Sequence, residues 1–297
     1  MNSCSICPRK CGIDREKHPG YCGVTDVLKV GRAGLHQWEE PCFSGTNGSG
    51  TVFFSGCAMH CVFCQNQAIA NGLEGKEISI QRLAQIYLEL QRQGAHNVNL
   101  VTAGHYVPQV RESLRIAKEN GLVIPVLYNS SGYESVESLK QLEGLVDIYM
   151  PDFKYWTSES GARYSNAPDY PQIAKAAIDE MVRQAGAGVF DETGGLMKRG
   201  VLVRHLILPG HINESKAIIR YLYDTYGDKI YLSIMNQYTP VAGIPLEKYP
   251  ELGRKITEEE YDQVVDYAID LGLENGFIQE GETAEESFIP AFDGTGV

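Results

Sequence analysis

Residues 51–64, TVFFSGCAMHCVFC, join a short apolar run to three closely spaced cysteines. The run is rich in β-branched and aromatic residues, which favour a β-strand. Cys57, Cys61 and Cys64 follow it at once with the spacing C-x3-C-x2-C. In α/β folds the loops that follow parallel strands carry the functional side chains. The stretch therefore predicts a sulfur-rich site at the C-terminal end of the first strand of an α/β sheet.

Strand and helix patterns alternate from about residue 50 to the C-terminal region. Strands are expected within residues 50–56, 97–104, 123–132, 145–154, 201–210, 229–237 and 275–280. Helices are expected within residues 78–94, 108–121, 134–144, 171–186, 213–227 and 257–272. Such alternation predicts a parallel sheet that is covered by helices.

Polar residues gather where these strands end. They are Thr102, Asn129, Ser130, Asp152, Lys154, His205, Asn236 and Gln237. The C-terminal ends of the strands carry the site in barrel folds. They also do so in doubly wound sheets, so the two architectures share this pattern. Of the two, we favour an open or partial (β/α) barrel.

The composition narrows the class of protein. The chain has 297 residues, of which 43% are hydrophobic, and a chain of this size can form a large core without disulfide bridges. Its net charge of −12 and the lack of a basic cluster argue against nucleic acid as a partner. The first residues lack the apolar core of a secretory signal, and no run reaches the length of a membrane span. We therefore expect a cytoplasmic protein, in which clustered cysteines bind metal or take part in chemistry.

Three thiolates without a fourth ligand nearby limit the kind of metal that fits. Soft thiolate ligands select zinc or iron–sulfur clusters. Structural zinc usually takes four ligands, commonly from CxxC pairs, and His60 inside the loop is poorly placed as the fourth. A four-iron cluster that is held by three thiolates keeps one iron open for a substrate or cofactor. A 4Fe–4S cluster is the favoured interpretation, with zinc or plain buried thiols as alternatives.

The C-x3-C-x2-C motif after a first strand, with Phe63 just before the last cysteine, resembles the radical S-adenosylmethionine superfamily. The resemblance covers residues 50–280 and implies a partial (β/α)6 barrel of parallel strands. It also implies that the open iron binds S-adenosylmethionine, with Phe63 among the cofactor-binding residues. Reductive cleavage of this cofactor yields a 5′-deoxyadenosyl radical, which abstracts a hydrogen atom from a substrate.

The strand ends YNSSGY (128–133), MPDFKYW (150–156) and VRHLILPGH (203–211) resemble the branch of this superfamily that includes pyruvate formate-lyase-activating enzyme. The lead-in SGTNGSGTVFFSGC (44–57) and the tail IPAFDGTGV (289–297) look like an uncharacterised iron–sulfur subgroup of that branch. By this resemblance the other cofactor-binding residues are Thr102, Asn129, Ser130, Asp152, Lys154 and His205. The turn VTAGHY (101–106) departs from the family's Gly-Gly-Glu turn because it has no acid. Thr102 or backbone carbonyls would then replace the acidic contact to the cofactor's amino group.

Five of these residues also have a purely structural interpretation. Asp152 could cap a turn, and Lys154 could be a solvated lysine. Asn129 and Ser130 are common turn formers ahead of a glycine. His205 lies in an apolar strand and could be a core histidine.

A second group of cysteines, Cys4, Cys7, Cys11 and Cys22, precedes the alternating region. Four thiolates can close a tetrahedral zinc site or hold a second iron–sulfur cluster. A redox disulfide pair that staples the segment is the alternative. Residues 1–45 do not join the alternation, and we interpret them as a Cys-rich metal-binding appendage that is separate from the three-cysteine cluster. Residues 46–297 then form the barrel.

The sequence leaves three functions open. The first is a radical S-adenosylmethionine enzyme that takes hydrogen from a glycyl position of a partner protein. The second is an enzyme of the same superfamily that modifies a peptide or a metabolite. The third is a non-catalytic, metal-stapled regulatory protein, which the missing acid at residues 102–105 favours. Either enzyme would need an electron donor such as flavodoxin or ferredoxin, and neither a nucleic acid nor a membrane is expected as a partner.

Overall fold

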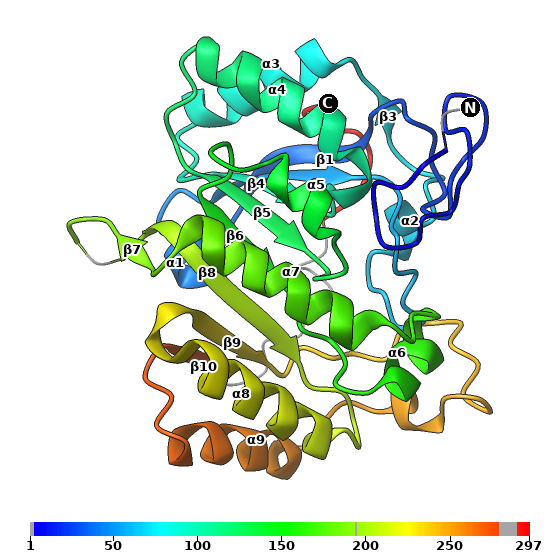
Figure 1. Ribbon diagram of the computed structural model, residues 1–297, viewed down its shortest axis with the longest axis vertical. Helices are drawn as coiled ribbons and strands as arrows, with labels where there is room; N and C mark the ends of the chain where they lie inside the picture. The colour runs from blue at the N-terminus through cyan, green and yellow to red at the C-terminus, as the bar shows by residue number, and fades with distance from the viewer. Residues whose placement is uncertain (1–2, 194, 279–289) are drawn as a thin grey trace.

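A computed structural model describes residues 3–193, 195–278 and 290–297. Ten strands within these residues form one sheet, whose main path runs β10-β9-β8-β6-β5-β4-β2-β1-β3, with β7 paired to β8 (Figure 1). The strands are β1 (Lys29–His36), β2 (Ser49–Phe54), β3 (Lys76–Glu77), β4 (Val98–Val101), β5 (Val126–Ser130), β6 (Ile148–Pro151), β7 (Val189–Phe190), β8 (Met197–Leu206), β9 (Tyr231–Met235) and β10 (Gly276–Ile278).

The central part of the sheet is parallel. Strands β2, β4, β5, β6, β8, β9 and β10 pair in this direction. Strand β1 is antiparallel to β2, β3 is antiparallel to β1, and β7 is antiparallel to β8. Among the described residues β10 and β3 lie at opposite ends of the path, so the sheet is open and does not close into a full barrel. This confirms the predicted α/β fold with a partial barrel of parallel strands.

Helices connect successive parallel strands and follow the sheet along its length, as Figure 1 shows. They are α1 (Pro41–Ser44), α2 (Gln67–Ala70), α3 (Ile80–Arg92), α4 (Val107–Glu119), α5 (Val136–Lys140), α6 (Ser158–Ser165), α7 (Tyr170–Ala185), α8 (Ile212–Tyr226) and α9 (Glu258–Asp270). The described residues also form the short 3-10 helices η1 (Gly104–Tyr106), η2 (Gly227–Lys229) and η3 (Pro250–Gly253). In the described parts of the chain, no helix is both long enough and apolar enough to cross a membrane.

Side-chain caps begin helices α3 and α9. The Ser79 hydroxyl accepts a hydrogen bond from the Arg82 N–H and so caps α3. Thr257 and Glu260 form a capping box at the start of α9. Both caps satisfy backbone N–H groups that have no partner within the helix.

Helix α6 is an element that the sequence did not predict. It contains Gly161 and three serines, which are weak helix formers. The Thr157 hydroxyl caps it by accepting from the Ser160 N–H at 3.2 Å. A Cβ on Gly161 would lie 2.3 Å from the carbonyl oxygen of Ala167, so only glycine allows this close approach. Tertiary contact therefore forms this helix where intrinsic propensity is low.

The N-terminal segment is only partly separate from the sheet. Strand β1 lies within residues 1–45 and pairs with β2. The C-terminal residues lie along the same strand, where the Gly31 carbonyl accepts from the Gly294 N–H at 2.9 Å. The alternation did not reveal β1 because it precedes the first parallel strand and runs the opposite way. The division at residue 45 stays a prediction, whereas β1 belongs to the sheet.

The strands beside the cysteine loop are buried on both faces. Every residue of β4, β5 and β6 is buried, as expected for a sheet with helices on one side and a filled interior on the other. In β5, Asn129 reaches the interior pocket, whereas Tyr128 packs against Tyr149 with ring centroids 6.1 Å apart. This alternation decides which strand residues reach the site.

Candidate functional site

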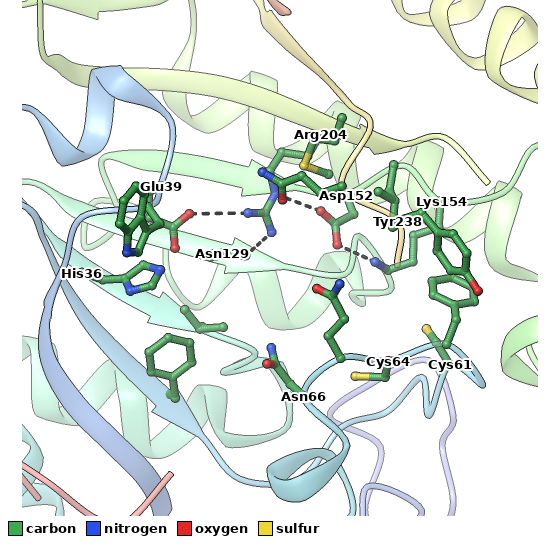
Figure 2. Close-up of a pocket in the computed structure, with 18 of the residues that line it drawn as sticks. His36, Glu39, Cys61, Cys64, Asn66, Asn129, Asp152, Lys154, Arg204 and Tyr238 are labelled. Carbon is green, nitrogen blue, oxygen red and sulfur yellow. Dashed lines mark hydrogen bonds and ion pairs between the residues drawn. The ribbon is translucent and has the colours of Figure 1, made fainter. Parts of the chain in front are cut away.

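One pocket of about 280 Å³ lies at the C-terminal ends of the parallel strands (Figure 2). Its volume is near the lower limit for small-molecule sites. The lining residues are His36, Trp38, Glu39, Phe53, Cys61, Phe63, Cys64, Gln65, Asn66, Val101, Asn129, Asp152, Lys154, Arg204, Leu206, Met235, Gln237, Tyr238 and Pro290. Apolar walls and a few charged groups thus converge beside two cysteines.

The loop between β2 and α2 carries the three-cysteine motif. Cys61 and Cys64 line the pocket, whereas Cys57 faces a smaller space that it shares with Thr102. The Cys64 N–H donates to the Cys61 carbonyl at 3.0 Å, which folds this part of the loop into a turn. Burial and the two neighbouring cysteines raise the pKa of Cys64 to about 12. The Cys64 sulfur therefore stays protonated unless a metal stabilises its thiolate.

Arg204 of β8 is the centre of a buried network of charges (Figure 2). Its Nε donates to Asp152 Oδ1 at 3.0 Å, and its Nη2 donates to Asn129 Oδ1 at 2.9 Å. Its Nη1 lies 3.5 Å from Glu39 Oε2. Lys154 Nζ donates to the second Asp152 oxygen at 2.6 Å. The four charged side chains are between 8% and 19% exposed, so water and salt screen them weakly.

The two cations keep the central carboxylate ionised. Burial opposes the ionisation of Asp152, but the Lys154 ammonium and the Arg204 guanidinium outweigh it and hold the pKa below its ordinary value. Burial also opposes the charge on Lys154, but Asp152 raises the pKa of this lysine. For Glu39 burial dominates and raises the pKa, although Arg204 opposes it. The pocket thus presents positive and negative groups in fixed positions, which suits a ligand that carries both charges.

Four of the predicted cofactor-binding residues line this pocket. They are Phe63, Asn129, Asp152 and Lys154. The Phe63 ring is set edge-on against Tyr155, Tyr164 and Tyr238, with centroid distances of 6.1 to 6.4 Å. The aromatic packing fixes the orientation of Phe63 next to Cys64.

Thr102 and Ser130 lie outside the pocket. Thr102 has a left-handed backbone with φ of 61°, which is unusual for a β-branched residue, and it faces the small space beside Cys57. The Ser130 hydroxyl accepts from the Gly132 N–H at 3.1 Å. This contact is the one expected of a turn-forming serine.

His205 also lies outside the pocket. Its Nδ1 lies 2.7 Å from the Phe153 carbonyl and its Nε2 lies 2.9 Å from Ser215 Oγ. Burial lowers the pKa of His205 to about 4, so the ring is neutral. Neighbouring residues of a strand point to opposite faces, and it is Arg204 that faces the interior. An arginine within an apolar strand needs partners when it is buried, and this is the sequence signal that marks Arg204.

Glu39 is the second member of the network that the sequence did not single out. It follows β1, and its Oε1 accepts from Asn99 Nδ2 at 2.9 Å. His36 and Trp38 of the same segment line the pocket wall. Glu39 meets Arg204 only because β1 pairs with β2, so no local motif marks it.

Residues 44–150 match the family model of a 4Fe-4S single cluster domain. The matched segment contains Cys57, Cys61 and Cys64 and extends almost to the end of β6. The chain is also 28% identical, over 281 residues, to an uncharacterized protein of Methanocaldococcus jannaschii, MJ0674. That alignment covers 92% of this chain and 76% of the relative.

Solved structures share the fold at low sequence identity. SuiB of Streptococcus suis bound to the precursor peptide SuiA has a TM-score of 0.50 and 13% identity, over 75% of this chain and 46% of SuiB. Methylornithine synthase, PylB, has a TM-score of 0.47 and 17% identity, over 75% of this chain and 68% of PylB. The FeFe-hydrogenase maturase HydG of Carboxydothermus hydrogenoformans has a TM-score of 0.46 and 11% identity, over 79% of this chain and 58% of HydG. The chain thus spans less than two thirds of SuiB and HydG, and the likeness concerns the fold alone.

The four N-terminal cysteines precede the matched segment, and two of them, Cys11 and Cys22, lie near Gly20. The sulfurs of Cys11 and Cys22 lie 3.4 and 3.5 Å from the place that a Cβ on Gly20 would take. No group of three or more His, Cys, Asp and Glu within the described ranges is arranged to hold a single metal ion. The loop of Cys57 is included in that finding. An iron–sulfur cluster does not need its three thiolates to meet at one ion, because each thiolate binds a different iron. A metal on the N-terminal cysteines stays a prediction.

Proposed function

We propose that this protein is a radical S-adenosylmethionine enzyme with a 4Fe–4S cluster on Cys57, Cys61 and Cys64. The observation that carries the proposal is the match of residues 44–150 to a 4Fe-4S single cluster domain whose cysteines follow β2 at the edge of the pocket. The open parallel fold agrees with the resemblance that the sequence motif suggests.

The donor set of the loop fits such a cluster. Three thiols on one short loop supply soft sulfur ligands and leave one iron without a protein ligand. Burial raises the pKa of Cys57 and of Cys64, and the nearby Lys154 ammonium opposes this effect in both. A cation beside the loop also favours the negative charge of a thiolate-ligated cluster. When bound, the cluster would supply the electron that cleaves S-adenosylmethionine to methionine and a 5′-deoxyadenosyl radical.

Residues of the pocket would bind and orient the cofactor. Asn129, Asp152 and Lys154 offer polar partners to its ribose and amino-acid groups. Arg204 holds Asp152 and Asn129 in place through its two hydrogen bonds. Phe63 offers an apolar surface. In these roles the positive and negative groups of the pocket would bind a cofactor that itself carries both charges.

The contact to the amino group of the cofactor falls to another residue in this chain. The turn after β4 has no acid, and Thr102 of this turn shares a small space with Cys57. We assign the contact to Thr102 or to a backbone carbonyl of the same turn. A threonine hydroxyl accepts a hydrogen bond from an ammonium without adding a charge.

The proposal extends to the substrate as a hydrogen-atom donor. A glycyl position of a partner protein is the first candidate, because the strand ends at residues 128–133, 150–156 and 203–211 resemble those of glycyl-radical-enzyme activators. A peptide or metabolite substrate is the second, and the peptide-bound SuiB structure is a reason to test peptides early. Flavodoxin or ferredoxin would serve as the electron donor.

Anaerobic reconstitution with iron and sulfide tests the cofactor assignment. Relative to Cys42→Ala, which removes a buried thiol outside the loop, the triple variant Cys57→Ala/Cys61→Ala/Cys64→Ala should hold about four fewer irons per chain. S-adenosylmethionine should then change the electron paramagnetic resonance signal of the reduced wild type and of Cys42→Ala. A cluster whose signal ignores the cofactor would contradict the proposal.

A further inference from the structure

The C-terminal end of α6 is attached to the cysteine loop. The Val62 N–H donates to the Tyr164 carbonyl at 2.9 Å. The Ser165 hydroxyl donates to Cys61 Sγ at 3.0 Å. Ser165 is 2% exposed, so its hydroxyl has little access to bulk water. A residue about a hundred positions away in the sequence thus places a proton donor on the middle cysteine of the loop.

The other two cysteines receive hydrogen bonds from the loop itself. Cys57 Sγ accepts from the Met59 N–H at 3.4 Å. Cys64 interacts with the backbone N–H of Asn66. Both donors are backbone N–H groups of the segment between β2 and α2. The donor to Cys61 is different, because it is a side chain that another element supplies.

The direction of the hydrogen bond to Cys61 follows from which of the groups carry a proton. A serine hydroxyl has one proton to donate, and a thiolate only accepts. Ser165 Oγ also lies 2.7 Å from the Tyr155 hydroxyl, which is buried. With Cys61 as a thiolate, all three groups are satisfied when Ser165 donates to the sulfur and Tyr155 donates to Ser165. The Tyr155 hydroxyl also interacts with Cys61 directly. The two hydroxyls form a chain that points at Cys61.

Arg9 fixes this arrangement from the N-terminal segment. Its Nε donates to the Ala58 carbonyl at 2.8 Å, and its Nη2 donates to the Ser165 carbonyl at 2.8 Å. Its Nη1 donates to the Asn166 carbonyl, and the guanidinium lies 4.2 Å from the centre of the Tyr21 ring. A planar fork with several donors can bridge two backbone segments in this way, which a lysine cannot. Arg9 therefore ties the cysteine loop to the end of α6.

We propose that Ser165 is a positioning residue that sets the reduction potential of the cluster through its hydrogen bond to Cys61, with Arg9 holding it in register. The inference rests on the proposed 4Fe–4S cluster. Reduction adds negative charge that the ligating sulfurs share, so a proton donor to one sulfur favours the reduced state. The hydroxyl of Ser165 thus makes the cluster easier to reduce.

A redox titration of the reconstituted full-length protein, followed by electron paramagnetic resonance, tests this inference. Ser165→Ala should lower the reduction potential by about 59 mV, which corresponds to a tenfold shift of a one-electron equilibrium. Ser165→Thr keeps the hydroxyl and should restore the wild-type potential. Ser160→Ala is the matched control, because Ser160 lies on the same helix but donates to Glu214.

The outcomes separate this inference from the proposed function. If the wild type binds no cluster, the proposed function fails. If it binds one and Ser165→Ala titrates at the wild-type potential, only the role of Ser165 fails. Ser165→Ala should keep its iron because the three thiols are unchanged, and loss of iron would overturn the tuning role in favour of a purely structural one.

Discussion

Arg204 shows how one residue organises the pocket. It contacts Glu39, Asn129 and Asp152, which come from three different parts of the sheet. All are largely buried, so Glu39 depends on this guanidinium for charge compensation, and Asp152 shares it with the Lys154 ammonium. Removal of one partner of a buried ion pair leaves an uncompensated charge, which destabilises more than the pair stabilised.

Arg204→Met should therefore lower the free energy of unfolding by about 3 to 5 kcal/mol. Arg199→Met is a suitable control, because Arg199 is exposed on the same strand and should change stability by at most about 0.5 kcal/mol. Urea unfolding of the metal-free proteins measures both. Equal small effects of the two substitutions would mean that the network contributes nothing to the fold.

His205 should make stability depend on pH. Burial lowers its pKa from 6.5 to about 4, so between these values the unfolded chain binds a proton that the folded chain does not. Stability from neutral His205 is complete above pH 6.5 and falls as the pH drops through this window. The free energy of unfolding should fall by about 3 kcal/mol across this window.

Urea unfolding at several pH values checks this expectation with His205→Gln. The stability advantage of the wild type over this variant should shrink from pH 7 towards pH 4. His18→Gln, at an exposed position, should follow the wild type at every pH. Parallel curves for the wild type and His205→Gln would rule out the buried neutral histidine.

At the residue scale, the sequence predicts part of the site. Phe63, Asn129, Asp152 and Lys154 all reach the pocket, because each follows or ends a parallel strand. His205 does not reach the pocket, because neighbouring residues of a strand point to opposite faces. Since the strand is apolar on both faces, its sequence does not show which residues face the pocket.

At the scale of elements, Gly132 positions two strand ends relative to one another. It follows β5 with a φ of 75°, and a Cβ there would lie 2.2 Å from the Asp152 carbonyl oxygen. Gly121 also has a positive φ, of 94°, but has no atom within 4 Å of that position. A comparison of the two glycines therefore distinguishes the effect of backbone strain from the effect of close packing.

Gly121→Ala should cost about 1 to 2 kcal/mol, because a left-handed residue with a Cβ is strained. Gly132→Ala should cost more and should also weaken binding of S-adenosylmethionine, since the end of β6 must move. Urea unfolding and calorimetric titration with the cofactor measure the two effects. The idea fails if the two variants lose equal stability and bind the cofactor alike.

The elements that the sequence missed share a physical cause. Strand β1 is antiparallel and precedes the α/β alternation, and α6 is rich in serine and contains glycine. Both form through contacts with distant segments, which local pattern does not encode. The elements with strong periodicity and caps, such as α3 and α9, were predictable for the opposite reason.

At the scale of the whole molecule, the N-terminal segment and the cysteine loop are in direct contact. The sequence predicts a separable appendage, yet the Cys57 N–H donates to the Cys22 carbonyl at 3.0 Å, and Arg9 contacts the Ala58 carbonyl. We now expect changes in the N-terminal segment to affect the cluster. Glu39 also belongs to residues 1–45, and it lines the pocket.

Arg9→Gln should accelerate the release of iron from the reconstituted protein to a chelator, several-fold relative to the wild type. The substitution removes the fork that joins the loop to α6 while it leaves all eight cysteines in place. Lys10→Gln removes the neighbouring exposed charge and should release iron at the wild-type rate. Identical rates of iron release from all three proteins would support an N-terminal appendage that is separate from the cluster.

The most direct test of the account is the formation of 5′-deoxyadenosine. The reconstituted protein, reduced with dithionite under anaerobic conditions, is incubated with S-adenosylmethionine, and the products are measured by liquid chromatography and mass spectrometry. We predict 5′-deoxyadenosine and methionine in equal amounts from the wild type and from Cys42→Ala, and neither from Cys61→Ala. A wild-type protein that holds its cluster but forms no more 5′-deoxyadenosine than Cys61→Ala would contradict the central claim.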